Sequence, residues 1–130
     1  MPFRWSQRSL KNMVGLHPDL RKVCDLALQK SPVDFIIIGG RRSLAQQRIY
    51  VKQGKSQTMN SRHLYGLAVD YCGVGGSFDM KMLRLIAGGF KEAAKELAIP
   101  IEWGGDWKSF KDNDHIQLSA KKYPNNWEKK

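Results

Sequence analysis

The stretch from Ser61 to Asp70 constrains this chain most, because it combines a strand pattern with two side chains that bind metals. His63 stands seven residues before Asp70, and Gly66 lies between them. Large and small side chains alternate over residues 67–71, which in a strand places Asp70 on a face kept open by a small neighbour. Gly66 lets the chain turn so that His63 can approach Asp70. An imidazole and a carboxylate that converge on one point suit a zinc ion.

A zinc site needs a third protein ligand, and the sequence offers few candidates. The chain has only three histidines. His17 precedes a predicted helix and is interpreted as a helix-start residue, whereas His115 follows a polar turn and begins a strand-like segment. We therefore predict that His63, Asp70 and His115 bind one zinc ion, with a fourth position for water.

A catalytic zinc site also needs a carboxylate that takes a proton from water. Asp112 stands three residues before His115 and is the predicted general base, with Glu102 and Asp114 as alternatives. Cys72 lies on the same predicted strand face as Asp70. It is expected either to be a fourth metal ligand or to pack beside the site. Its spacing, with no third Cys or His beside it, favours packing.

The combined pattern resembles the signature of a known enzyme group. It reads Ser61-x-His63-x-x-Gly66-x-Ala68-x-Asp70, followed by Asp112-x-x-His115. This resembles the D-Ala-D-Ala metallopeptidase and hedgehog-like group, and within it the phage L-alanyl-D-glutamate endopeptidases, over about residues 6–118. The resemblance implies an α+β fold with a small, mainly antiparallel sheet, helices packed on it, and zinc in a cleft on the sheet.

The resemblance also implies roles for further residues. The family arginine aligns with Arg42, which would bind the scissile carbonyl oxygen as negative charge develops on it. A solvent-exposed arginine is the alternative. Ser61 would contact substrate or hold a ligand in place, and Trp103 or Trp107 would line the cleft or be buried. An aspartate at position 112, where the family often has glutamate, favours the endopeptidase branch.

Apolar periodicity and turn residues predict the remaining elements. Pro100 ends the longest predicted helix, and Gly88 and Gly89 within it predict close packing against the sheet. Helices are expected at about 6–15, 18–30, 43–52 and 79–99, and strands at about 34–38, 67–72, 101–103 and 115–118.

The 130 residues are expected to form a single zinc peptidase domain, residues 1–130, which acts as a monomer. Its core covers about residues 6–118, and a basic tail, residues 119–130, frays at its end. No apolar run approaches the ~20 residues that span a bilayer. The net charge of +10 favours attraction to a polyanionic cell envelope. Nucleic acid is not expected, since no nucleic-acid-binding motif accompanies the charge.

We predict a zinc-dependent peptidoglycan endopeptidase, an endolysin of bacteriophage type, that cuts between L-alanine and D-glutamate to lyse the cell wall. Neither flanking segment, 54–60 or 73–77, offers an arginine to hold a free C-terminal carboxylate, which favours internal cleavage. The alternatives are a D-alanyl-D-alanine carboxypeptidase or dipeptidase on the same scaffold and a non-catalytic, zinc-containing basic binding module. Residues 1–5 lack the apolar segment of a secretory signal. We therefore expect synthesis in the host cytoplasm and release to the wall through a holin-type partner.

Overall fold

The structure, a computed structural model, describes residues 3–56 and 58–126. It confirms the predicted α+β fold, with each predicted helix and strand found within a few residues of its expected place. The helices are α1 (Gln7–Asn12), α2 (Pro18–Lys30), α3 (Leu44–Lys52) and α4 (Met80–Leu97). The strands are β1 (Phe35–Gly39), β2 (Ala68–Gly73), β3 (Ile101–Trp103) and β4 (His115–Leu118), and two 3-10 helices are η1 (Arg62–Tyr65) and η2 (Gly104–Asp106).

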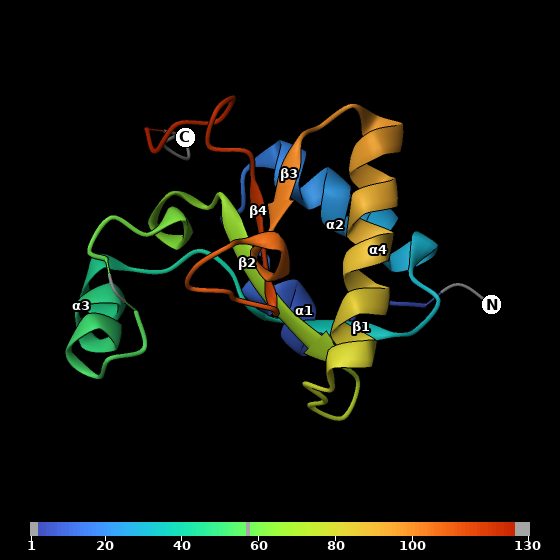
Figure 1. Cartoon of the computed structure of the whole chain (residues 1–130), viewed down its shortest axis with the longest axis horizontal. Helices are drawn as coiled ribbons and strands as arrows, with labels where there is room; N and C mark the ends of the chain where they lie inside the picture. Colours follow the sequence, from blue (N-terminus) through green and yellow to red (C-terminus); the bar gives the residue numbers. More distant parts are fainter. Residues whose placement is uncertain (1–2, 57, 127–130) are drawn as a thin grey trace.

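The four strands form one antiparallel sheet in the order β1-β2-β4-β3. β2 and β4 are the inner strands, and Asp70 on β2 pairs with His115 on β4. Helices α2 and α4 pack against each other, and α4 also contacts β2 and β3 (Figure 1). Helix α3 lies apart from this layered core, at the left of the view (Figure 1). The two predicted ligands on strands therefore lie at the centre of the sheet, where pairing on both sides restricts the backbone.

Tyr71 shows how the alternation on β2 builds the core. Its ring is fully buried and lies 6.2 Å from that of Phe35 and 5.4 Å from that of Phe90, measured between centroids. Its hydroxyl donates to the Leu83 carbonyl at 2.8 Å and lies 3.1 Å from the Asn113 carbonyl. Because the residue before it in a strand points the opposite way, burial of Tyr71 directs Asp70 away from this core.

The outer edge of β1 is covered by α1. The Ile37 amide donates to Ser9 Oγ at 3.0 Å, and the Asn12 side chain donates to the Ile37 carbonyl at 2.8 Å. Ser9 is fully buried although it is polar, because its hydroxyl oxygen accepts the hydrogen bond from the β1 backbone. Side chains of α1 thus satisfy backbone groups that an edge strand otherwise leaves unpaired.

The two glycines of α4 do not serve the predicted purpose. A Cβ added at Gly89 would lie 2.9 Å from Ser31 Cα, at the end of α2, whereas a Cβ at Gly88 would meet nothing within 4 Å. The predicted contact with the sheet is therefore wrong, because Gly89 allows close approach of α2 and α4 instead. Across the described residues, no helix has the length and apolar character needed to cross a membrane.

The beginning of the predicted tail packs on the domain. Tyr123 donates its hydroxyl proton to Asp19 Oδ2 at 2.7 Å. The Arg62 guanidinium donates to the carbonyls of Leu118 and Tyr123 and to the Asn125 side chain. The compact part of the chain thus extends beyond the predicted limit of about residue 118, and residues 127–130 lie outside the described part.

Replacing Gly66 with alanine is expected to destabilise the protein strongly. Gly66 has φ +69, and an added Cβ would lie 2.5 Å from the Gly15 carbonyl oxygen. The left-handed conformation costs about 1–2 kcal/mol and the clash about 1–3 kcal/mol more. Gly75 is a matched control, because its φ is +83 but a Cβ there would meet nothing within 4 Å. Urea unfolding with a chelator present should show the larger loss for Gly66→Ala; equal losses would contradict the close approach.

Candidate active site

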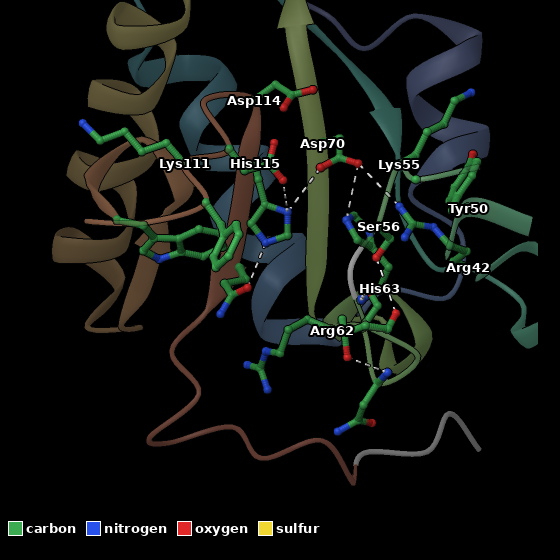
Figure 2. A pocket seen from close by; sticks show the side chains of 18 residues that line it. Arg42, Tyr50, Lys55, Ser56, Arg62, His63, Asp70, Lys111, Asp114 and His115 are labelled. Atoms are coloured by element: carbon green, nitrogen blue, oxygen red, sulfur yellow. Dashed lines mark hydrogen bonds and ion pairs between the residues drawn. The ribbon is translucent and has the colours of Figure 1, made fainter. Parts of the chain in front are cut away.

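The sheet and the short helix η1 bring the predicted ligands together. His63 lies in η1, which has Ser61 as its N-cap and Gly66 as its C-cap. Its Nε2 atom lies 3.3 Å from Asp70 Oδ2, and His115 Nδ1 lies 3.3 Å from Asp70 Oδ1 (Figure 2). The two imidazole rings are 5.2 Å apart between centroids. The carboxylate of Asp70 therefore lies between two ring nitrogens that come from separate elements.

Hydrogen bonds to the other ring nitrogens determine which nitrogen faces Asp70. His63 Nδ1–H donates to the Gly40 carbonyl at 2.9 Å, and His115 Nε2–H donates to Gln117 Oε1 at 2.8 Å. In neutral imidazoles these bonds leave lone pairs on His63 Nε2 and His115 Nδ1, as metal ligation requires.

Neither of these hydrogen-bond partners, the Gly40 carbonyl and the Gln117 side chain, was predicted from the sequence. The i, i+2 spacing of Gln117 from His115 on a strand would have placed the two side chains on one face. The partner of His63 is a backbone carbonyl. Every residue has such a group, so the sequence does not show which one His63 contacts.

The three predicted ligands fit a metal ion. His63, Asp70 and His115 can each present a ligand atom, and these atoms lie within 4.8 Å of one another. Two imidazole nitrogens and one carboxylate oxygen form a donor set that zinc accepts. Cys72 is outside this group among the described residues, and burial raises the pKa of its thiol, which supports packing as its role.

The charges at the site favour an ionised carboxylate. Burial alone would raise the pKa of Asp70, but when both rings carry a second proton, the charge of His63 and hydrogen bonds from both histidines lower it well below its ordinary value. Burial lowers the pKa of His115, whereas its hydrogen bond to Asp70 raises it, and the net change is upward. Asp70 is thus negatively charged at neutral pH, as a metal ligand must be.

Asp112 stands beside the ligands on a loop held by the end of β3. Its Oδ2 atom lies 3.7 Å from His115 Nδ1, and its side chain is 47% exposed. Its amide donates to the Gly104 carbonyl at 3.1 Å, and a Cβ at Gly104 would lie 2.1 Å from the Asp112 carbonyl oxygen. Trp103 Nε1–H donates to the neighbouring Asn113 carbonyl at 2.8 Å. Gly104 and Trp103 therefore place the Asp112 carboxylate at the mouth of the site.

The two alternative bases differ in their placement. Glu102 accepts from Trp107 Nε1–H at 3.4 Å and from the Ala120 amide at 3.0 Å, and it does not line the cleft. Asp114 lines the cleft beside Asp112, and burial together with a hydrogen bond with Asp112 raises its pKa well above its ordinary value. Asp112, whose carboxylate lies next to His115, remains the predicted base, with Asp114 as its alternative.

Arg42 is held within the site and is not the solvent-exposed arginine of the alternative reading. Its side chain is 14% exposed, and its Nη2 atom lies 3.7 Å from Asp70 Oδ2. Its backbone amide donates to the His63 carbonyl at 2.9 Å, and its guanidinium lies 4.5 Å from the centroid of the Tyr50 ring. A cation therefore stands beside the ligands, where a carbonyl oxygen could receive its hydrogen bonds.

Ser61 and the two tryptophans are the remaining predicted site residues. Ser61 is 8% exposed and lines the cleft, and its hydroxyl accepts from the amide of the predicted ligand His63 at 3.2 Å, so the structure is compatible with both roles predicted for it. Trp103 is buried. Trp107 lines the cleft, with its ring centroid 5.3 Å from that of His115.

One cleft of about 740 Å³ contains the predicted ligands together with Arg42, Ser61, Trp107, Asp112 and Asp114 in its lining. Its walls combine the predicted site residues with a loop after α3 and a loop before β4 (Figure 2). Within the described part of the chain, four cations line it: Arg42, Lys55, Arg62 and Lys111.

Comparisons with known proteins agree over almost the whole chain. Residues 1–123 match the family described as phage L-alanyl-D-glutamate peptidase. The L-alanyl-D-glutamate peptidase of Escherichia phage T5 is 33% identical over 125 residues, which cover 90% of this chain and 91% of that protein. The solved structure of the L-Ala D-Glu endopeptidase ChiX of Serratia marcescens is 44% identical, with a TM-score of 0.87 and 95% of each chain covered.

A more distant likeness concerns the fold alone. The vancomycin resistance D,D-dipeptidase VanXYg has a TM-score of 0.52 at 18% identity, over 79% of this chain and 50% of that one. This confirms that the scaffold resembles D-Ala-D-Ala peptidases.

Proposed function

Because this chain belongs to the phage L-alanyl-D-glutamate peptidase family, we propose that it hydrolyses the bond between L-alanine and D-glutamate in the stem peptide of peptidoglycan. The observation that carries the proposal is the convergence of His63, Asp70 and His115 at a cleft beside Asp112 and Arg42. A binding module needs neither the carboxylate nor the arginine there.

We assign the residues of the site as follows. His63, Asp70 and His115 would hold zinc, which fits their donor set and the protonation of their rings. When bound, zinc supplies Lewis-acid chemistry that acidifies water and polarises a carbonyl. Asp112 takes a proton from the attacking water, whose oxygen bonds to the alanyl carbonyl carbon. Asp112 then gives that proton to the glutamyl nitrogen as the carbon–nitrogen bond breaks.

Arg42 donates hydrogen bonds to the carbonyl oxygen as negative charge develops on it. The Asp70 carboxylate competes with substrate for the guanidinium of Arg42. At a separation of 3.7 Å, however, this contact is weak. Ser61 supports His63 by capping η1, so its contribution is to orient a ligand.

The cations of the cleft support internal cleavage. An enzyme that removes a terminal D-alanine needs a fixed cation for the free carboxylate, and arginine serves this best. Arg62 lines the cleft, but its guanidinium already donates to Leu118, Tyr123 and Asn125. Lys55 and Lys111 are exposed and carry flexible side chains, so neither closes one end of the cleft.

Digestion of purified peptidoglycan tests the bond that is cut. We expect new D-glutamate amino termini, identified by mass spectrometry, with L-alanine left on the muramyl side. The Asp112→Asn protein at the same concentration is the control. Release of free D-alanine without a fall in turbidity would decide for the carboxypeptidase, and wall binding without new termini would decide for a binding module.

We further propose that the protein acts as a monomer and is made in the host cytoplasm. A holin-type partner would then open the membrane to it. The net charge of +10 supports attraction to an anionic envelope once the protein is released. Expression with and without a co-expressed holin, followed by culture turbidity, tests the need for a partner; lysis without a holin would contradict it.

A further inference from the structure

Gln47 is a buried polar residue on α3, a helix whose other residues are all partly or fully exposed. Every residue of α3 is described, and Gln47 alone among them is buried, with 0% exposure. Glutamine is mostly found at protein surfaces. Burial of its carboxamide therefore needs partners for both ends of the group.

Both ends of the Gln47 carboxamide have partners, and the partners determine its orientation. Arg42 Nη1–H donates to Gln47 Oε1 at 2.6 Å. On the other side, Gln47 Nε2 donates to the Thr58 carbonyl at 2.6 Å and to Ser56 Oγ at 2.8 Å. A guanidinium can only donate and a carbonyl can only accept, so a flipped carboxamide would oppose like groups at both ends.

The remaining contacts of Arg42 show what this bond adds. The backbone amide of Arg42 donates a hydrogen bond to the carbonyl of His63, one of the proposed metal ligands. Tyr50 lies against the guanidinium, but a ring face does not determine the rotation of a guanidinium above it. The contact with Asp70, at 3.7 Å, is too long for a strong hydrogen bond. The short bond to Gln47 is thus the directional contact that orients the side chain.

We infer that Gln47 is a positioning residue for the reaction, which holds Arg42 Nη2 toward the ligands while anchoring the loop that carries Ser56 and Thr58. This rests on the role proposed for Arg42. The loop lines the same cleft (Figure 2). One buried carboxamide therefore connects the group that binds the carbonyl oxygen to a wall of the substrate site. Neither Gln47 nor this connection follows from the metal-binding motif.

Three variants test the inference. Gln47→Met keeps the length of the side chain but removes every hydrogen bond. Gln47→Glu keeps an oxygen acceptor opposite Arg42 and removes the donors to the loop. Gln46→Met is the matched control, because the structure shows a hydrogen bond for the Gln46 amide but none for its side chain among the described residues.

We expect Gln47→Met to lower kcat by about 10–100-fold, the scale expected when a catalytic group moves by about 1 Å. Zinc content should equal that of the wild type, since no ligand contacts Gln47. Gln47→Glu should retain kcat within about threefold and show a raised KM, because Arg42 keeps its partner while the loop loses its anchor. Equal losses of kcat in both variants would overturn the inference.

A double-mutant cycle with Arg42→Ala distinguishes positioning from general damage. If Gln47 acts through Arg42, Gln47→Met should have almost no further effect on kcat in the Arg42→Ala protein. The same loss in both backgrounds would overturn the inference while leaving the role of Arg42 intact. Normal kcat for Arg42→Ala alone would overturn that role itself, so the two failures are distinct. Should Gln47→Met fail to fold, Gln47→Glu keeps the inference testable by itself: a loss of kcat of about tenfold or more with an unchanged KM would overturn it, because Arg42 retains its acceptor in that variant.

Discussion

Replacing His63 with alanine is expected to remove the metal and abolish hydrolysis. Two protein ligands would remain where a catalytic zinc needs three. The loss in kcat/KM should exceed about 10⁴-fold, because removing a general base alone costs about 10²–10⁴-fold and here the metal itself is lost. Metal analysis of the purified protein by mass spectrometry, with an assay on peptidoglycan, measures both effects.

His17 provides the matched control for this substitution. Its Nδ1 accepts from the Asp19 amide at 3.0 Å, as the N-cap of α2, and it does not line the cleft. His17→Ala should therefore lower the unfolding free energy by about 1 kcal/mol, the usual cost of losing a cap, but keep the metal and most activity. Full metal content with normal activity in His63→Ala would refute the assignment of the site.

Replacing Asp112 with asparagine is expected to leave the metal and the fold in place while activity falls by about 10²–10⁴-fold. The side chain keeps its size but can no longer accept a proton. The hydrogen bond from the amide of residue 112 to the Gly104 carbonyl does not involve the side chain, so the loop should retain its position. Measurements of kcat, zinc content and thermal unfolding on one preparation separate loss of the base from loss of structure.

Two aspartates of the same region serve as comparisons for Asp112→Asn. Asp106 forms an exposed ion pair with Lys91 at 2.7 Å and does not line the cleft, so Asp106→Asn should have little effect on kcat. Asp114→Asn tests the alternative base. Near-normal turnover of Asp112→Asn together with a large loss in Asp114→Asn would assign the proton transfer to Asp114.

Local patterns in the sequence predicted most elements because their signals are short-range. Pro18 and Pro100 define a helix start and a helix end through their own backbone geometry. The alternation around Asp70 predicted both a strand and the direction of the carboxylate, since successive side chains on a strand point to opposite faces. The packing partner of Gly89 was not predictable, because it depends on how α2 and α4 meet in space.

The same distinction applies to the site. The chain itself determined which residue types were available, and with only three histidines and one signature the predicted ligand set His63, Asp70 and His115 followed from the sequence. Only the tertiary structure decided which groups orient them, because those contacts join distant segments. The Gly40 carbonyl lies 23 residues before His63, and Gln47 connects Arg42 to a loop 11 residues further on. A hydrogen bond depends on distance and angle between atoms, and a one-dimensional pattern contains neither.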